Sequence, residues 1–399
     1  MKIYIILTDT KYSMKINVPK DVKLLSISFL FIFLGFNGVQ QYVTTYFYEA
    51  GFVDVGFRSL IIVYLFFALG NPFSAVFVSR YGPKKSMISG AIFYSVFIFS
   101  LVFESVIFVY LASAMLGIAA SLLWTGQNVY LIGASDERGY GKSAGFFNSL
   151  HSLGASVGVL FLGFLIAGFS FKLPFLVFSV FPLIGFFLLF GLRDLRCEER
   201  KNRFELVKKS LTNITALKLS VIWFSFNFVY GLVIGIVPIE IKDTLGISYV
   251  AVLGTLFYAM PILFSYFFGN VSDIAGRKTM IICSYIICIA GLVLLYFSGK
   301  VMLVAGIVLL AVNYSIVRPM TFALVGDVST KKNVEFLTAL FWMVQNIGVI
   351  LALVISTIVD AKIVYLSSVA VMILSLGVLI PLFRQDTWEI REKLSSEIR

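Results

Sequence analysis

One arginine and one histidine are the side chains in this sequence with the most scope for binding chemistry. Arg318 lies inside an apolar run at 301–326, directly before Pro319. The next acid along the chain, Asp327, is nine residues on, which is about 13 Å along a helix and on its opposite face. We expect Arg318 to anchor an anionic or strongly polar ligand in a cavity. The alternative is an arginine that extends to the end of its helix or braces the packing there.

His151 is the only histidine and lies in the run at 143–169, at a depth similar to that of Arg318. An imidazole titrates near neutral pH, so His151 could carry a proton. The alternative, which we favour, is a neutral imidazole hydrogen-bonded between helices. No Asp or Glu falls in the middle of any apolar run, so a proton carried on a carboxylate is not supported.

Several carboxamides and one tryptophan also lie inside apolar runs. Asn37 and Gln41 are four residues apart and would share a helix face, as would Trp124 and Asn128. Taken singly, such a side chain is more often a hydrogen-bonding contact between helices than a contact to a ligand. The others of this kind are Gln40, Gln127, Asn148, Asn227, Asn313, Gln345 and Asn346.

The composition indicates an all-α integral membrane protein. The 399 residues are 59% hydrophobic and 13% charged, where a soluble protein has about a quarter charged residues. Mean hydropathy is +0.96. Twelve apolar runs are each long enough to cross a bilayer. They lie at 24–48, 57–79, 86–103, 105–133, 143–169, 173–192, 218–240, 249–270, 279–298, 301–326, 334–359 and 362–383.

The runs divide into two sets of six. We expect a cytoplasmic N-terminal segment at 1–23, a bundle at 24–192, a cytoplasmic linker at 193–217, a second bundle at 218–383 and a cytoplasmic tail at 384–399. The linker and the tail alternate in charge, which is typical of surface helices. Met14 would serve equally well as a first residue, so residues 1–13 are a candidate extension.

The basic residues indicate the orientation. With the N-terminus inside, 26 of the 32 Lys and Arg fall in cytoplasmic segments. Only five fall in outer loops and one, Arg318, within a span. This bias predicts that both termini are cytoplasmic. The net charge of +11 is then explained by topology and by contact with the lipid bilayer, not by binding of nucleic acid.

A ten-residue stretch between two runs, GNVSDIAGRK at 269–278, has the residues of a tight cytoplasmic turn. Gly269 allows close helix approach and Gly276 allows a tight turn. The carboxylate of Asp273 can cap the start of a neighbouring helix. Arg277 and Lys278 hold the turn on the cytoplasmic side.

A second, degraded copy of this turn lies 194 residues upstream, at 75–85. Gly82 corresponds to Gly276 and Arg80 remains basic, but Ser79 stands where the acid would be. The same offset relates Gly154 to Gly348. A repeat of about half the chain is what two stacked halves would show.

These turns resemble the signature loop of the major facilitator superfamily of secondary transporters, and the resemblance covers essentially the whole chain. It implies two pseudo-symmetric six-helix bundles that rock around a central cavity. It also implies a latch made by Asp273, Arg277 and Lys278, and a second gate near Arg138 in the loop at 136–145. Because the first, fourth, seventh and tenth spans line the cavity in that family, the candidates for substrate contact are Asn37, Gln41, Trp124, Gln127, Asn227 and Arg318.

The expected function is transport of a small, polar or anionic organic solute across the cell membrane, with a coupling proton or ion as an open possibility. A proton-coupled drug exporter is one alternative. Gly145, Gly154 and Gly158 resemble the exporter motif, but Val159 replaces its proline. A transporter-like regulator without flux is another, which the degraded turn at 75–85 allows.

An enzyme is not expected. The sequence has no nucleotide-hydrolysis motif, no paired acids near the membrane surface and no metal-ligand spacing among Cys197, Cys283 and Cys288. We therefore expect no cofactor and no metal.

Overall fold

The computed structural model describes residues 18–103, 105–195 and 202–398, and all the regular structure in these ranges is helical. The candidate extension at 1–13 lies outside the described residues. Twelve described segments are long and apolar enough to cross a membrane, which confirms the predicted number. Two of these segments are each made of two helices, α6 with α7 and α9 with α10, and a proline lies close to each break.

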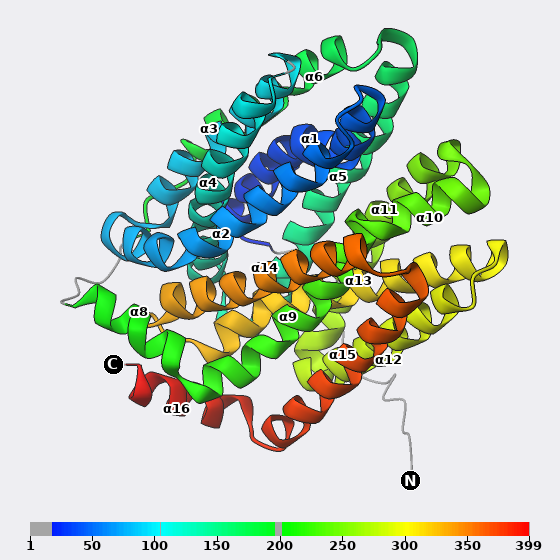
Figure 1. Cartoon of the computed structure of the whole chain (residues 1–399). Helices are drawn as coiled ribbons and strands as arrows, with labels where there is room; N and C mark the ends of the chain where they lie inside the picture. The colour runs from blue at the N-terminus through cyan, green and yellow to red at the C-terminus, as the bar shows by residue number, and fades with distance from the viewer. Residues whose placement is uncertain (1–17, 104, 196–201, 399) are drawn as a thin grey trace, which may run out of the picture.

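The first half of the chain forms one bundle and the second half another, seen in Figure 1 as the part that runs from blue to green through α1–α7 and the part that runs from green to red through α9–α15. The first holds α1 (Lys20–Glu49), α2 (Val53–Tyr81), α3 (Pro83–Ser100), η1 (Leu101–Phe103), α4 (Val106–Gly133), η2 (Glu137–Gly139), α5 (Tyr140–Phe169), α6 (Lys172–Phe178) and α7 (Phe181–Leu189). The second holds α9 (Ile214–Ile234), α10 (Ile236–Leu245), α11 (Ile247–Ala275), α12 (Arg277–Tyr296), α13 (Lys300–Val328), α14 (Val334–Ile358) and α15 (Ala361–Phe383).

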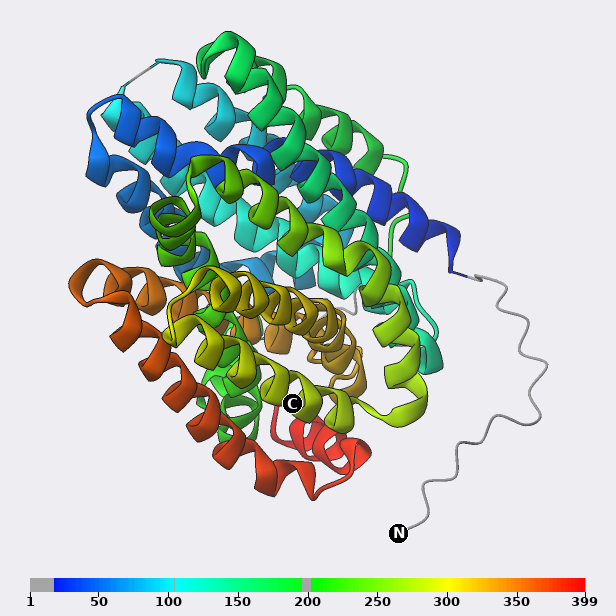
Figure 2. The same cartoon turned by 90° about the vertical axis from the view of Figure 1, so that its right-hand side faces the viewer.

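An even number of spans places the start of α1 and the end of α15 at the same end of the molecule. We call this the basic end, because most of the Lys and Arg residues fall in the segments that lie there. It also carries the α2–α3 and α11–α12 turns and the α4–α5 and α13–α14 loops (Figure 2). The predicted linker and tail helices are present there as α8 (Arg203–Thr212) and α16 (Thr387–Glu397). Val207 of α8 packs against Ala75 of α2 and Phe336 of α14, so the linker helix bridges the two halves.

Two seams join the halves, α5 against α11 and α2 against α14. Glycines allow α5 to pack closely on both of its neighbours. Gly154 and Gly158 lie against the backbone of Leu30 and Leu34 in α1, and a Cβ on Gly145 would lie 2.5 Å from the carbonyl oxygen of Ser265 in α11. Contacts of this kind let the helix backbones approach closely. Close packing matters in a membrane because an apolar side chain is buried equally well against lipid and against another helix.

Polar groups also tie the α5–α11 seam. Asn148 donates to the Ser265 hydroxyl at 2.8 Å, and that hydroxyl donates to the carbonyl of Ser315 in α13 at 3.1 Å. Ser149 donates to the carbonyl of Pro261, about four turns into α11, at 3.3 Å. The seam therefore holds the two halves together from the basic end to about mid-depth.

Candidate functional site

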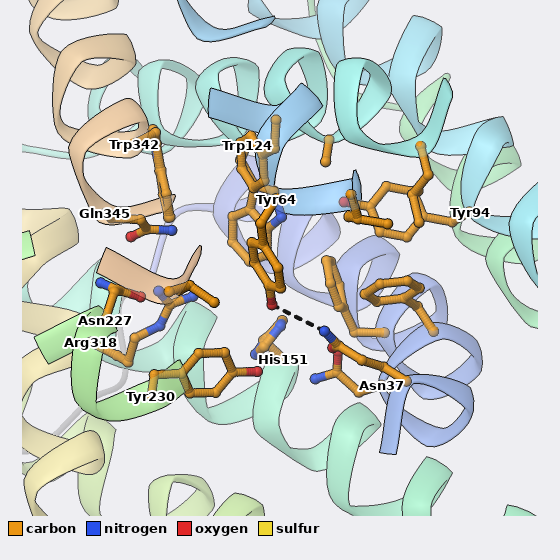
Figure 3. Close-up of a pocket in the computed structure, with 18 of the residues that line it drawn as sticks. Asn37, Tyr64, Tyr94, Trp124, His151, Asn227, Tyr230, Arg318, Trp342 and Gln345 are labelled. Atoms are coloured by element: carbon orange, nitrogen blue, oxygen red, sulfur yellow. Dashed lines mark hydrogen bonds between the residues drawn. The ribbon is translucent and has the colours of Figure 1, made fainter. Parts of the chain in front are cut away.

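A cavity of about 70 Å³ lies between the two halves, around Arg318 (Figure 3). Its walls come from α1, α2, α3, α4 and α5 on one side and from α9, α13 and α14 on the other, and none of the lining residues is acidic. The lining side chains are Phe33, Phe36, Asn37, Gln40, Val63, Tyr64, Phe67, Tyr94, Leu116, Ala120, Trp124, His151, Asn227, Tyr230, Tyr314, Arg318, Trp342, Gln345 and Val349.

Arg318 is 8% exposed and is surrounded by aromatic rings instead of carboxylates. Its guanidinium carbon lies 5.0 Å from the ring centroid of Phe322, 5.6 Å from those of Trp124 and Tyr314, and 5.7 Å from that of Trp342. Ring faces attract a cation, so this environment holds a buried charge without neutralising it. The Nε of Arg318 has no hydrogen-bond partner in the described structure.

His151 lies in the same cavity and is 3% exposed. Its ring packs against Phe33, with centroids 4.5 Å apart, and against Trp124 at 5.6 Å. Neither ring nitrogen has a hydrogen-bond partner among the described atoms. The predicted similar depth of His151 and Arg318 is thus observed, while the hydrogen bond between helices that we favoured for this imidazole is not.

The remaining polar groups differ between the two walls. Gln40 donates to the hydroxyl of Tyr64 at 3.0 Å on the side of the first half. On the opposite wall the side-chain amide of Asn227 donates to the carbonyl of Trp223 in its own helix. The side-chain oxygen of Gln345 is buried without a hydrogen-bond partner in the described structure. In Figure 3, Gln345, Asn227 and Tyr230 lie on the side of Arg318, and Tyr94 lies across the cavity from them.

An aromatic layer separates the cavity from the basic end. It consists of Trp124, Phe147, Phe322 and Trp342, which come from four helices of both halves. Ring centroids are 5.6 Å apart for Phe147 and Phe322, 5.8 Å for Phe322 and Trp342, and 5.2 Å for Trp124 and Trp342. The rings close the route from the cavity to the basic end in this conformation.

Five of the residues predicted to act in the membrane line the cavity together: Asn37, Trp124, His151, Asn227 and Arg318. Two do not. Gln41 lies beside a separate small pocket against α10 and α11, and Gln127 is fully buried in α4 with its amide unpartnered in the described structure. The rotation of each helix about its axis explains both positions. Successive residues of a helix point 100° apart, so Gln40 takes the cavity position in place of Gln41.

The prediction missed the tyrosines of the cavity and two residues of α14. Tyr64, Tyr230 and Tyr314 line it, as do Trp342 and Gln345. The spans that contain Tyr64 and Trp342, the second and the eleventh, are not among those that the family resemblance assigned to the cavity. The only sequence signal for these tyrosines is a ring with a hydroxyl group inside an apolar span. Membrane proteins also carry many tyrosines at the bilayer surface, and these obscure the signal.

The turn at 269–278 forms a latch at the basic end. The carboxylate of Asp273 accepts hydrogen bonds from the N–H of Gly141 at 3.1 Å and of Lys142 at 3.0 Å, in the first turn of α5. Arg277 pairs with Asp273 at 2.5 Å and with Asp327 of α13 at 2.8 Å. An anion at a helix N-terminus is favoured both by the free N–H groups and by the helix dipole.

The other gate residues have separate places. Gly269 packs against Gly141, but Lys278 contacts the carbonyl of Gln385 in its own half and is not part of the latch. The predicted repeat is visible in the backbone: Gly82 and Gly276 end α2 and α11 with φ of 90° and 86°. A side chain would be strained at either position.

The degraded copy forms no equivalent contact through Ser79, whose hydroxyl donates within its own helix to Val76. Arg80 is exposed and lies over the ring of Tyr81, at 5.2 Å. The side chain of Arg138 is outside the described part of the structure. Among the described residues no group of three or more His, Cys, Asp or Glu could hold a metal ion.

A scan against family models decides the classification. The model of the Major Facilitator Superfamily matches residues 25–252 and 219–395. The chain belongs to the major facilitator superfamily. Proteins of this family and fold are in general transporters and not enzymes.

Solved structures of the superfamily share the fold. The proton:xylose symporter XylE, bound to 6-bromo-6-deoxy-D-glucose, matches with a TM-score of 0.72 over 90% of this chain and 94% of its own. The sequence identity is 11%, so this likeness concerns the fold alone.

Curated relatives match over shorter stretches. UNC93-like protein MFSD11 of Xenopus laevis is 28% identical over 182 residues, 43% of this chain and 41% of its own length. UNC93-like protein 3 of Arabidopsis thaliana is 34% identical over 28% of this chain and 23% of its own. The putative potassium channel regulatory protein unc-93 of Caenorhabditis elegans is 30% identical over 29% of this chain and 16% of its own. The matched region thus spans about two fifths or less of these relatives.

Proposed function

We propose that this superfamily member is a secondary transporter that moves a small polar or anionic organic solute by alternating access. The observation that carries the proposal is Arg318, a buried cation that faces a cavity between the two halves with no acid in its lining. A charge inside a membrane protein is costly and is retained where it has a partner or a function. A bound anion would supply the missing partner.

The arrangement of contacts supports alternating access. The latch at Asp273 and the aromatic layer both lie between the cavity and the basic end, and both are made of groups from the two halves. Such contacts must break if the halves rock to open the cavity toward that end. We propose that the basic end is cytoplasmic and that the protein resides in the cell membrane, which follows from the bias of basic residues.

Reconstituted protein tests the transport function. Proteoliposomes loaded with an unlabelled candidate solute should take up the labelled form by exchange, and Arg318→Gln should abolish the exchange while leaving the protein folded. Arg80→Gln is the matched control, since it removes one exposed positive charge away from the cavity. Exchange that is equal in the two variants would contradict the role of Arg318.

A transporter-like regulator is the second candidate. It is favoured by the name of the relative from Caenorhabditis elegans, a putative potassium channel regulatory protein, and by Ser79, which leaves the α2–α3 turn without the acid of its counterpart. A regulator would show no exchange for any solute but would co-purify with a membrane partner. Disruption of that partnership by a surface variant, with the cavity intact, would favour this candidate.

Coupling to a proton through His151 belongs to the same proposal of transport. The imidazole lines the cavity with both nitrogens unpartnered in the described structure, so it can meet a solute or water. Uptake that rises with an imposed pH gradient, and that His151→Gln makes independent of the gradient, would assign the coupling to this residue. A proton-coupled drug exporter for cations is less well supported, because the cavity lining contains no acid.

A further inference from the structure

We infer that the solute is a compact monocarboxylate of one to three carbons, held with its carboxylate against Arg318 and its short apolar end toward Phe36 and Leu116. The inference rests on the proposed transport function and narrows it from polar or anionic solutes to one class. It follows from three properties of the cavity: its charge, its size and the difference between its walls.

The charge of the cavity allows one negative charge. Arg318 is the only Lys or Arg in the lining, and no carboxylate lines the cavity to neutralise it. A guanidinium binds a carboxylate through two parallel N–H···O bonds, which fits one planar head group. A second carboxylate would meet neutral amides, hydroxyls and rings in the lining, with no second Lys or Arg to offset the water it loses, which is costly. A dicarboxylate is therefore disfavoured by the same argument that admits a monocarboxylate.

The unpartnered groups show where the head group would bind. The Nε of Arg318, the carbonyl oxygen of Gln345 and both ring nitrogens of His151 are buried without hydrogen-bond partners in the described structure. In Figure 3, Arg318 and Gln345 lie together on one side of the cavity, and His151 lies between them and Asn37. The Nε–H of Arg318 is a donor, and the imidazole of His151 offers at least one N–H, whereas the Gln345 oxygen is an acceptor and would not bind a carboxylate directly. A buried donor without a partner costs about 1–3 kcal/mol, so a carboxylate that accepts from Arg318 and His151 gains correspondingly.

The size of the cavity limits the rest of the molecule. A cavity of about 150 Å³ is known to accept benzene, and this one is about 70 Å³, less than half of that. It therefore accommodates a few non-hydrogen atoms in this closed arrangement, as in acetate or propionate, and not an aromatic ring. The rings around Arg318 act as neutral walls for the cation and leave no room for stacking a further ring.

Part of the wall opposite the arginine is apolar, which favours a carboxylate with a short alkyl end over an inorganic anion of the same size. Phe36 packs on Tyr94 with centroids 4.9 Å apart, and Tyr94 lies across the cavity from Arg318 in Figure 3. Leu116 and Ala120 belong to the same lining. An alkyl group would be buried there, whereas nitrate has no apolar surface to bury.

The test uses the full-length protein in lipid nanodiscs and measures binding by calorimetry together with the shift in melting temperature. The ligands are acetate, propionate, benzoate, succinate, nitrate and propionamide, the last being the neutral analogue of propionate. We expect acetate and propionate to bind and the other four to bind at least tenfold more weakly. Benzoate, succinate, nitrate or propionamide binding as tightly as propionate would overturn the inference.

Variants locate the binding. Arg318→Gln should weaken propionate about 10- to 100-fold, the loss expected for a charge-assisted hydrogen bond. Arg318→Lys should retain part of the affinity, and Lys300→Gln, which removes an exposed charge at the start of the same helix and away from the cavity, should leave it unchanged. If Arg318→Gln does not fold, the ligand series on the natural protein still decides.

The exchange assay separates this inference from the proposed function. Transport of a larger or neutral solute through the cavity would refute the monocarboxylate and keep the transporter. Absence of exchange for every solute would refute both the monocarboxylate and the transport function.

Discussion

The carboxylate of Asp273 at the end of α11 accepts a hydrogen bond, at 3.1 Å, from the backbone N–H of Gly141 in the first turn of α5. The two residues belong to different halves of the molecule, and the bond closes the seam between them at the basic end. Gly141 allows this approach because a Cβ there would lie 2.6 Å from an oxygen of Asp273. A side chain of one half thus caps a helix of the other, and we propose that closure of the basic end depends on that cap.

Replacing Asp273 should open the basic end. Asp273→Ala removes both acceptors of the cap and one partner of Arg277, which should cost the closed state about 1–2 kcal/mol and increase the open population about five- to thirty-fold. Spin labels on exposed positions 85 and 274, in a background without other cysteines, would report the separation of the halves. Asp273→Asn retains one acceptor oxygen and should show a smaller change; an unchanged distance distribution in both variants would refute the latch.

Arg277 and Lys278 are adjacent basic residues that should differ in their effect on stability. Arg277 is 9% exposed and joins Asp273 to Asp327, so Arg277→Ala leaves two nearby carboxylates without their common partner. Breaking a buried pair in this way costs about 3–5 kcal/mol. Lys278→Ala removes a contact to a single carbonyl and should cost less than about 1 kcal/mol. Thermal melting of the two variants in nanodiscs measures the difference, and equal losses would contradict the structure.

Two glycines of α5 should respond in opposite directions to alanine. At Gly145 the added methyl group would meet backbone atoms of Ser265 and Tyr266 at 2.5 and 2.9 Å, so Gly145→Ala should force α5 away from α11 and lower the melting temperature. At Gly168 nothing lies within 4 Å, and alanine there should stabilise the helix by about 0.4–1 kcal/mol. A pair of melting curves decides this, and a stabilising Gly145→Ala would show that the seam is looser than described.

The tail helix α16 connects the two halves through one ion pair. Arg391 lies 3.2 Å from Glu137, and Asn333 of α14 donates to the carbonyl of Leu394, so α16 is attached to one half and reaches the other. Glu137 is 70% exposed, so the pair should contribute less than about 1 kcal/mol and weaken with salt.

Charge reversal tests the role of that pair. Arg391→Glu should raise the open population of the basic end a few-fold, and the double variant with Glu137→Arg should restore it. The same spin-label distances measure this, at 50 and 500 mM salt. Failure of the double variant to recover would show that the contact between α16 and the α4–α5 loop does not involve this ion pair.

The sequence by itself determined the twelve spans, the two halves and the turn that closes them. Hydropathy over about 20 residues is a local property, and a span has no other stable form in a bilayer than a helix. The positive φ of Gly276 and the acid three residues before it are also local requirements of one turn. For the same reason the depth of Arg318 and His151 followed from counting residues along helices of known rise.

Only the tertiary structure decided which side chains meet in the cavity. A span that is apolar on every face carries no pattern to distinguish its lipid side from its packed side, so the rotation of each helix is set by its neighbours. That rotation brings Gln40 to the cavity and moves Gln41 and Gln127 away from it. It also places the rings of two residues distant in sequence, Trp124 and Trp342, beside Arg318 and leaves it without an acid. The chemistry of the site therefore depends on close packing between helices, which spacing along one chain does not encode.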